Sequence, residues 1–205
     1  MKYLVLFLLL ARAQVPAYGQ EKPAFVLEAE DGPVRVYVRP EANDDMSIRV
    51  TARAQATVAA VVAVLNDVTG YPDWVHRCER AYVLPGGTAD AFTYYSLVNL
   101  PFPFSDREVV AAIEQATDPR TGRFQRTISS RPDAVPRSKK AERIEVYEAV
   151  WEVAPAERGW VSVSCTVRTA AGAGLPTWLR KEIMTGGPAK TVNNLLRTVA
   201  DKAGQ

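Results

Sequence analysis

Residues 99–110 read Asn99-Leu100-Pro101-Phe102-Pro103-Phe104-Ser105-Asp106-Arg107-Glu108-Val109-Val110 and join two stretches that both have the composition of β-strands. Neither proline can donate a backbone hydrogen bond to a strand ladder, and each biases the residue before it towards an extended conformation. The pattern therefore predicts an open loop over residues 100–105 that offers Phe102 and Phe104 as apolar surface, which suits the mouth of a cavity. The alternative is a tight turn whose phenylalanines belong to the core.

Further segments with strand composition lie on both sides of this loop, and turn sequences rich in proline, glycine and aspartate separate them. Short turns between consecutive strands favour antiparallel pairing. We expect strands at Phe25–Glu28, Val34–Arg39, Ser47–Ala54, Arg80–Leu84, Ala91–Leu100, Arg107–Ala116, Arg123–Ser130, Arg143–Val153 and Trp160–Arg168.

Two helices complete the pattern. The nearly continuous apolar stretch Val58–Asp67 follows Thr57, a residue type favoured as an N-cap, and predicts a buried helix. A long helix opens near Pro176, is interrupted at Gly186-Gly187-Pro188 and continues to about Ala200. Its apolar residues recur at spacings of three and four, so one side faces the sheet. The expected fold class is α+β, a curved antiparallel β-sheet wrapped around a long C-terminal α-helix.

The period of two along a strand predicts which side chains point inward. In 106–114 the acids Asp106, Glu108 and Glu114 mark the wet face, which turns Arg107, Val109, Ala111 and Ile113 inward. In 147–153 the same argument turns Tyr147, Ala149, Trp151 and Val153 inward. The strand that holds Tyr94 and Tyr95 cannot be phased, because both of its faces are mixed. An inward guanidinium is costly to bury alone, so Arg107 should meet an internal carboxylate, backbone carbonyls or the polar end of a ligand. A structural pair with Asp106 is the alternative.

The 205 residues, 47% of them hydrophobic, suffice for one core, and no low-complexity linker divides them. Lys2, the apolar run Tyr3–Ala11 and the small residues before Gln20 match a signal peptide that is cleaved after Gly19. We therefore expect a signal peptide over 1–19, a single domain over 20–205 and a periplasmic or secreted protein that is not integral to the membrane. A retained N-terminal anchor is the alternative.

Charge argues against a nucleic-acid partner. Residues 1–19 hold Lys2 and Arg12 and no acid, so 25 basic residues less these two leave 23, against 23 acidic ones. A nucleic-acid surface needs a basic excess. The one dense basic cluster, Arg137, Lys139, Lys140 and Arg143, is interpreted as a solvated loop, with transient contact to anionic lipid headgroups as its functional alternative.

No motif for catalysis or metal binding is present in the sequence. The single histidine, His76, has no spaced cysteines or carboxylates beside it, and no nucleophile elbow, phosphate loop or His-Glu-x-x-His occurs. Cys78 and Cys165 are expected to be unpaired, and Cys165 has no activating histidine near it in sequence. We therefore expect no enzyme activity, no metal and no cofactor.

Four motifs carry a family resemblance that runs from about Thr57 to Ala203. They are Tyr71-Pro72-Asp73-Trp74, then Leu100–Glu108 as the most specific, Trp151, and Gly174-Leu175-Pro176-Thr177-Trp178-Leu179. On these residues the chain resembles the START (StAR-related lipid-transfer) domains of the helix-grip, Bet v 1-like superfamily. The resemblance implies a U-shaped sheet that grips the last helix around a tunnel for one lipid, with the loop 100–105 and that helix closing its mouth. It implies no metal or redox cofactor, and it places Cys78 and Cys165 towards opposite ends of the sheet. The chain differs from the better-known animal members in its signal peptide and in the compact loop Arg131–Ala141.

These arguments lead to one functional hypothesis, non-catalytic binding and transfer of a lipid or other hydrophobic molecule by a protein that is monomeric by default. An enzyme resembling the polyketide aromatases and cyclases is the first alternative, favoured if Arg107, Tyr94, Ser96 and His76 converge in one pocket. A domain whose cavity is filled by its own side chains is the second. The candidate cavity or gate residues are Trp74, Tyr94, Phe102, Phe104, Arg107, Val109, Ala111, Trp151, Trp178, Leu179, Ile183 and Met184, with Arg107 as the polar anchor.

Overall fold

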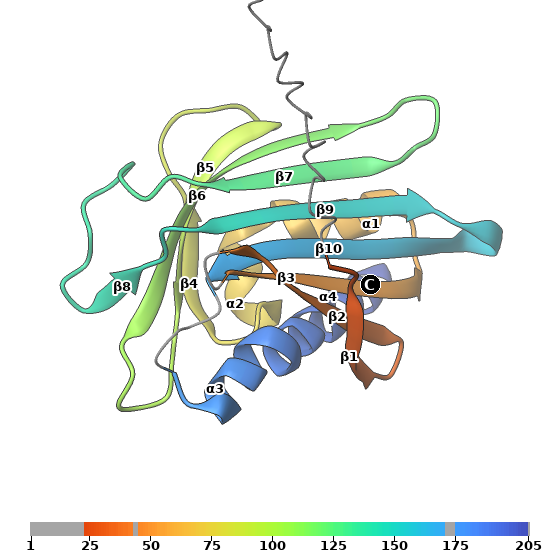
Figure 1. The fold of residues 1–205 in the computed structure, drawn as a ribbon. Helices are drawn as coiled ribbons and strands as arrows, with labels where there is room; N and C mark the ends of the chain where they lie inside the picture. Colours follow the sequence, from red (N-terminus) through yellow and green to blue (C-terminus); the bar gives the residue numbers. More distant parts are fainter. Residues whose placement is uncertain (1–22, 43–44, 171–174, 205) are drawn as a thin grey trace, which may run out of the picture.

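A computed structural model describes residues 23–42, 45–170 and 175–204. The predicted signal peptide and Gly174 lie outside these residues. Figure 1 shows one large sheet that curves around the helices, with the C-terminal helix running across its concave side. In the described part of the chain, no helix is long and apolar enough to cross a membrane.

Ten strands form the sheet among the described residues, nine of them in the order β1-β2-β3-β10-β9-β7-β6-β5-β4, and β8 pairs with β6. Every neighbour on the nine-strand path is antiparallel, whereas β8 is parallel to β6. The strands are β1 (Val26–Asp31), β2 (Val34–Pro40), β3 (Asp45–Gln55), β4 (Cys78–Val83), β5 (Ala91–Val98), β6 (Asp106–Thr117), β7 (Phe124–Ser130), β8 (Ala141–Arg143), β9 (Tyr147–Pro155) and β10 (Trp160–Ala170).

The predicted antiparallel sheet is thereby confirmed, but the bounds of one predicted strand are wrong. The segment Arg143–Val153 was expected to be a single strand, but the chain ends β8 at Arg143 and begins β9 at Tyr147. The two pieces have different partners, because β8 pairs with the first three residues of β6 while β9 lies between β7 and β10. Local composition carries no trace of this change of partner.

The N-terminal helix α1 (Val58–Asn66) begins as predicted. The Thr57 hydroxyl accepts a hydrogen bond from the Ala60 backbone N at 3.1 Å, which satisfies one of the free N–H groups of the first turn. A short 3-10 turn, η2 (Val68–Gly70), leads into α2 (Tyr71–Trp74), and η3 (Glu157–Gly159) connects β9 to β10.

The C-terminal helix is continuous rather than interrupted. It comprises α3 (Thr177–Lys181), the π-helical turn η4 (Glu182–Gly186) and α4 (Gly187–Ala203). Gly186 and Gly187 keep helical dihedral angles, with φ −65° and −63°. Pro188, which has no N–H to donate, lies in the first turn of α4, where a wider π turn precedes it. The predicted break at 186–188 is therefore wrong, although the irregularity behind it is real.

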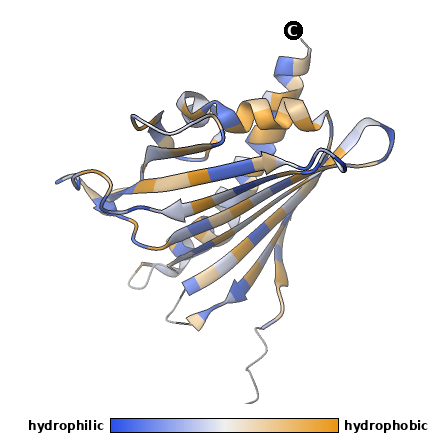
Figure 2. Ribbon diagram, turned by 90° about the horizontal axis from the view of Figure 1, so that it is seen from above, coloured by the Kyte–Doolittle hydropathy of each residue, from blue (hydrophilic) through white to orange (hydrophobic). Residues whose placement is uncertain are grey.

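The core lies between the concave face of the sheet and the helices. Figure 2 shows hydrophobic and hydrophilic residues alternating along the strands, as expected for a sheet with two different faces. From α4 the buried residues are Ala189, Val192, Leu195 and Val199, and the inward phases predicted for β6 and β9 are confirmed at Val109, Ala111, Ile113, Ala149, Trp151 and Val153.

The opposite face of β6 is exposed at Glu114, as predicted, but not at Glu108, contrary to the prediction. Glu108 is 1% exposed and Val110 is completely buried, because residues 131–143 fold back over this face. A second, small apolar cluster forms there from Tyr95, Leu97 and Val110 with Leu84, Val135 and Ala141 packed against them. Arg143, expected in a solvated loop, is buried in the same place.

Candidate functional site: a cavity between the sheet and the C-terminal helix

A cavity of about 570 Å³ lies between the inner face of the sheet and the helices. Strands β5, β6 and β9, the helix α2, the segment 142–146 and the C-terminal helix all contribute side chains to its wall. Its lining includes Leu65, Tyr71, Trp74, Val75, Val98, Leu100, Val109, Ile128, Ile144, Trp151, Leu175 and Ile183. The walls are therefore largely apolar, as in most pockets for small organic molecules.

Aromatic rings form one side of this cavity. Trp74 makes edge-on contacts with Tyr71 and Trp151, with ring centroids 5.1 Å and 6.2 Å apart, and Tyr71 contacts Tyr94 in the same way at 5.8 Å. Such contacts stabilise aromatic pairs beyond the area they bury. The Trp74 indole N–H is buried and, among the described residues, has no hydrogen-bond partner.

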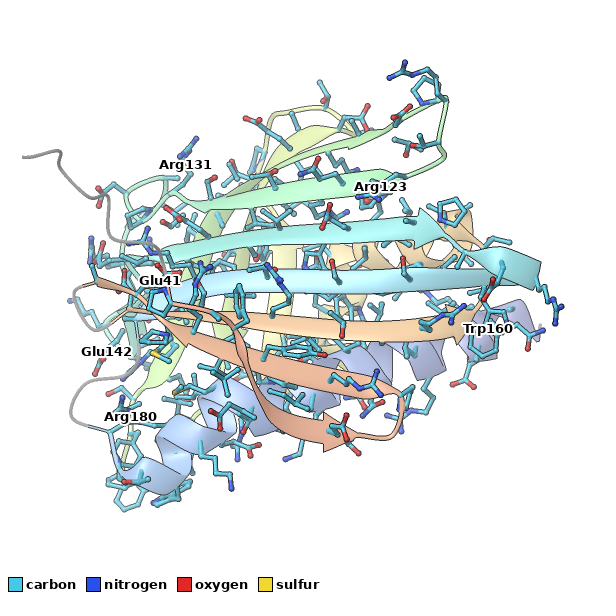
Figure 3. All side chains as sticks on the ribbon, turned by 45° about the vertical axis from the view of Figure 1, so that its right-hand side comes forward. Glu41, Arg123, Arg131, Glu142, Trp160 and Arg180 are labelled. Carbon is cyan, nitrogen blue, oxygen red and sulfur yellow. The ribbon has the colours of Figure 1, made fainter. Side chains whose placement is uncertain are left out.

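The charged residues that line the cavity are Arg107, Glu142, Arg143 and Glu145. Arg143 pairs with Glu108 and Glu145 pairs with Arg137, while Arg107 and Glu142 pair with each other. Arg107 Nη1 lies 2.8 Å from Glu142 Oε2, and the same nitrogen donates to the Ser105 carbonyl at 2.8 Å. The Arg107 side chain is 22% exposed and that of Glu142 is 63% exposed. Figure 3 labels Glu142 and Arg180 at the same end of the molecule, opposite Trp160. Asp106, the alternative partner in the sequence, instead accepts a hydrogen bond from the Leu100 backbone N at 3.0 Å.

Hydroxyl groups supply the remaining polarity. The structure settles the phase of β5, because Tyr94, Ser96 and Val98 line the cavity while Tyr95 and Leu97 lie on the other face. Burial raises the pKa of the phenols of Tyr94 and Tyr147, each of which also interacts with the other. Both phenols therefore remain neutral at ordinary pH and can donate or accept hydrogen bonds.

A smaller compartment of about 250 Å³ adjoins the first beneath the π turn. The two share Trp151, Tyr147 and Ile183 as walls. Ile48, Val50, Val167, Leu179 and Val192 make the second compartment apolar, and Cys165 also lines it. Both cysteines are free, as expected, and burial raises the pKa of Cys165 far above its ordinary value and that of Cys78 to about 11. Neither thiol has the character of a nucleophile.

His76 lies at the rim of the smaller compartment. Its Nε2 is 2.9 Å from Glu182 Oε1 on the π turn, and Lys190 Nζ lies 2.8 Å from the same oxygen. The Thr191 hydroxyl accepts a hydrogen bond from the His76 backbone N at 3.1 Å. Burial lowers the pKa of His76, although Glu182 acts against it. The histidine thus ties the linker before β4 to the C-terminal helix. In the described ranges, no cluster of three or more His, Cys, Asp or Glu side chains is arranged to hold a metal ion.

The loop 100–105 contacts the first turn of the C-terminal helix. The rings of Phe104 and Trp178 meet at a centroid distance of 6.5 Å and an angle of 67°. Phe102 is 96% exposed, so the alternative that both phenylalanines belong to the core does not hold for Phe102. Trp178 is 56% exposed. The two aromatic side chains lie beside the end of the cavity that Leu100 and Leu175 line.

The structure brings together about half of the predicted site residues. Trp74, Tyr94, Arg107, Val109, Trp151 and Ile183 line the larger compartment, and Leu179 lines the smaller one. Phe104 and Trp178 meet outside the cavity, Phe102 projects into solvent, Ala111 lies in the core, and Met184 packs against the core without lining either compartment.

Several residues that line the cavity were not among the predicted site residues. Glu142 and Ile144 lie in a segment whose basic residues indicated a solvated loop, and only its contact with β6 turns it into a wall. Tyr147 was placed inward by its phase, yet a strand pattern cannot distinguish a core position from a cavity wall. Three of the four residues that would favour a cyclase, Arg107, Tyr94 and Ser96, line one compartment, while His76 lines the other.

The chain is similar to known proteins in sequence and in fold. The family model described as polyketide cyclase / dehydrase and lipid transport matches residues 54–196. Uncharacterized protein PA1579 of Pseudomonas aeruginosa is 30% identical over 176 residues, which cover 84% of each chain. A STAR-related lipid transfer protein from Xanthomonas axonopodis has the same fold, with a TM-score of 0.76 and 22% identity over 86% of this chain and 98% of that one. Human StAR-related lipid transfer protein 5 superposes with a TM-score of 0.74 and 12% identity over 90% of each chain.

Proposed function

The chain belongs to the polyketide cyclase / dehydrase and lipid transport family, and we propose that it binds one lipid or similar hydrophobic molecule in its cavity and carries it without chemical change. The observation that supports this proposal most strongly is the cavity itself, about 570 Å³ of space with largely apolar walls and few charged residues, among them the Arg107–Glu142 pair. A domain filled by its own side chains would not retain such a volume, since protein interiors are close-packed. The solved structures of the same fold are named as lipid transfer proteins.

The distribution of apolar and polar residues over the cavity walls suggests how a ligand would lie. Apolar walls supply affinity, at about 0.8 kcal/mol for each methylene group removed from water. Arg107 and Glu142, together with the hydroxyls of Tyr94 and Ser96, would then fix the polar end of the molecule. A few convergent polar groups are the usual source of orientation in such pockets.

Exchange of the ligand requires an opening, and we place it between the loop 100–105 and α3. The contact between Phe104 and Trp178 closes this edge, and it is a contact between two aromatic rings at the surface, without a hydrogen bond among the described contacts. Exposed Phe102 lies on the same loop. An apolar tip beside the opening would allow transfer to occur at a membrane surface, where the ligand avoids passage through water.

Four titratable groups around the cavity, those of Tyr94, Tyr147, Cys165 and Glu142, are poorly suited to acid–base catalysis. A general base near neutral pH needs a pKa close to the pH at which it works. Burial moves the pKa values of Tyr94, Tyr147 and Cys165 away from that range, and Glu142 is paired with Arg107. We therefore favour carriage over cyclisation.

Export remains part of the proposal. The pattern of residues 1–19 supports a cleaved signal peptide and a periplasmic or secreted location for the domain over 20–205. N-terminal sequencing of the protein recovered from its own envelope tests this: a chain that begins at Gln20 is expected, and one that begins at Met1 would contradict it.

Native mass spectrometry, followed by extraction and identification of bound molecules, tests the function. We expect the protein purified from its own envelope, or incubated with the lipids of that envelope, to retain one apolar molecule for each chain. A protein that stays empty and ignores added lipids would contradict the carrier function. Stoichiometric turnover of a bound polyketide-like substrate to a new product would contradict the non-catalytic part alone.

A further inference from the structure

Strand β8 is attached to the sheet in an unusual way. It is the one strand among the described residues that pairs in parallel, and its register sets Arg107 opposite Glu142 and Glu108 opposite Arg143. Successive residues of a strand point to opposite faces of a sheet. Two ion pairs of reversed direction therefore connect the same two strands, one on the cavity side and one on the outer side.

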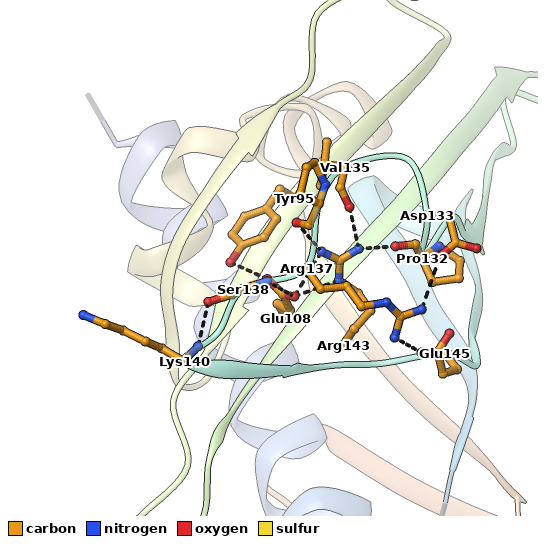
Figure 4. A network of polar contacts seen from close by, with 11 residues as sticks. Tyr95, Glu108, Pro132, Asp133, Val135, Arg137, Ser138, Lys140, Arg143 and Glu145 are labelled. Carbon is orange, nitrogen blue, oxygen red and sulfur yellow. Dashed lines mark hydrogen bonds and ion pairs between the residues drawn. The ribbon is translucent and has the colours of Figure 1, made fainter.

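The outer pair is almost completely buried. Nε and Nη2 of Arg143 both lie 3.0 Å from Glu108 Oε1, and the two side chains are 0% and 1% exposed. Glu108 also accepts hydrogen bonds from the Ser138 backbone N at 2.9 Å and the Tyr95 hydroxyl at 3.1 Å. Figure 4 shows these contacts converging on the Glu108 carboxylate. Burial acts to raise the pKa of Glu108, but these hydrogen bonds outweigh it and the pKa is lowered.

Arg143 also holds the segment that leads to β8. Its guanidinium donates to the carbonyls of Pro132 and, at 3.2 Å, of Pro136. The planar fork of an arginine can serve several acceptors at once, which the compact ammonium of a lysine cannot do in the same geometry. Residues 132–143 are thereby fastened to the outer face of β5 and β6, over the small cluster around Val110.

The inner pair, Arg107 and Glu142, is not held by a comparable network of buried hydrogen bonds. Glu142 is 63% exposed, and ion pairs between exposed groups contribute only about 0–1 kcal/mol. The place of the Glu142 carboxylate is therefore determined by the backbone of β8, and that backbone is held by the buried pair behind it. The outer pair thus decides whether Arg107 presents a bare charge to the cavity or one that is already neutralised.

We propose that Glu108 and Arg143 are positioning residues that determine which ligand end groups the cavity accepts. By holding Glu142 against Arg107 they keep the charge of the Arg107 guanidinium neutralised, which favours an uncharged end group, such as a hydroxyl, over an anionic one, such as a carboxylate. A hydroxyl can donate to Glu142 and accept from Arg107 together, whereas a carboxylate must compete with Glu142 for the guanidinium. This inference rests on the proposed function, because it concerns the ligand of that same cavity.

The test compares two ligands that differ only at the end group. Dissociation constants for dodecanol and dodecanoate are measured at pH 8 by displacement of a fluorescent apolar probe from the mature protein. We expect Glu142→Gln, which uncovers Arg107 directly, to shift the ratio of the two constants at least about fivefold towards the acid. Glu108→Gln should shift it in the same direction. Lys139→Gln is the matched control, since Lys139 lies in the same segment but is exposed and lines neither compartment, and its ratio should stay within about twofold of the wild type.

Loss of stability alone would weaken both ligands together, so only a changed ratio supports a positioning role. Glu108→Gln could fail to fold, because it leaves the Arg143 charge buried without a partner. In that case Arg143→Lys is measured instead, since it keeps the charge and removes the contacts to the loop carbonyls. We expect it to shift the ratio of the two dissociation constants towards the acid by a smaller factor. An unchanged ratio in the folded variant, beside a shifted ratio in Glu142→Gln, would overturn the positioning role and leave the carrier function intact. A wild-type protein that binds neither ligand nor probe would overturn both.

Discussion

At the scale of single residues, Arg126 has the least expected surroundings. It is 1% exposed, and its donors reach the Leu65 carbonyl at 2.7 Å, Gln115 Oε1 at 2.6 Å and the side chain of Asn66. None of these acceptors carries a full charge. The Leu65 carbonyl belongs to the last turn of α1, where the helix dipole is negative and a cation is favoured. Arg126 therefore acts as the C-terminal cap of α1 from a strand on the other side of the core.

Replacing Arg126 should be costly. Arg126→Ala would remove both guanidinium donors of the half-buried Gln115 Oε1. The Leu65 carbonyl would keep the Tyr71 hydroxyl as a donor at 3.1 Å, and Asn66 Oδ1 would keep Gln115 Nε2 at 3.1 Å. We expect a loss of about 1–3 kcal/mol in the free energy of unfolding, measured by urea denaturation. Arg123→Gln is the control, because Arg123 is exposed and pairs with Glu152 at 3.3 Å at the surface, so its change should stay within about 0.5 kcal/mol. Equal effects of the two changes would show that the network around Arg126 contributes nothing.

His76 gives the protein a pH dependence near neutrality. Burial lowers its pKa below the ordinary value of 6.5, with Lys190 and Arg77 adding to the effect and Glu182 opposing it. The unfolded chain then takes up a proton at a higher pH than the folded chain does. Stability is therefore greatest above about pH 6.5 and declines as the pH falls from there through the folded pKa.

The variant His76→Gln should remove this decline. His76 is the single histidine of the chain, so no other side chain has an ordinary pKa in this range. We expect the urea midpoint of the wild type to fall between about pH 7.5 and pH 5.5, and that of His76→Gln to change less. Identical slopes for the two proteins would contradict the assignment to His76.

At the scale of elements, the loop 100–105 and the C-terminal helix are in contact with each other. Phe104 contacts Trp178 on α3, and Ile183, two residues after the end of α3, lies on the π turn and lines both cavity compartments. A displacement of α3 would therefore move a cavity wall together with the opening that we propose. π turns within helices are often found at functional sites, because they shift the register of the following turn.

This pairing predicts a difference between the two phenylalanines. Phe104→Ala removes the aromatic contact and should raise the rate of ligand dissociation several-fold, measured by stopped-flow transfer of a fluorescent lipid from the protein to vesicles. Phe102→Ala serves as the control, since the Phe102 ring is 96% exposed and closes nothing; its rate of dissociation into an apolar trap in solution should be unchanged. Equal rates for wild type and Phe104→Ala would remove the Phe104–Trp178 contact from the gate.

At the scale of the whole molecule, the parts that the sequence predicts are those that depend on local period. The strand phases at Val109 and Trp151, the cap at Thr57 and the long amphipathic helix follow from residues that are neighbours in the chain. The parts that it does not predict depend on distant partners. Arg143 meets Glu108 across 35 residues, and Arg126 meets Leu65 across 61. In both cases an arginine that its neighbours in the sequence would lead one to expect in solvent is buried, because a segment distant in sequence packs against it. The Arg107–Glu142 pair likewise depends on the pairing of β8 with β6.

If the cavity binds a ligand as proposed, the stability of the whole molecule depends on that ligand. A ligand that binds only the folded state adds about 2.7 kcal/mol to the free energy of unfolding at a hundred times its Kd. For a domain of 150–250 residues this corresponds to a rise in Tm of about 5–11 °C. We expect this rise when delipidated protein is titrated with a lipid that it has been shown to retain.

Filling the cavity should abolish the rise. Ile183 lines both compartments from the C-terminal helix, so Ile183→Trp places a large ring where the ligand lies. Ala200→Trp is the matched control, because Ala200 is exposed further along the same helix. Delipidated Ile183→Trp should melt at a Tm that added lipid does not change, whereas Ala200→Trp should respond like the wild type. A full ligand-dependent rise in Ile183→Trp would place the ligand elsewhere, because a tryptophan at this position and a molecule that fills both compartments compete for the same space.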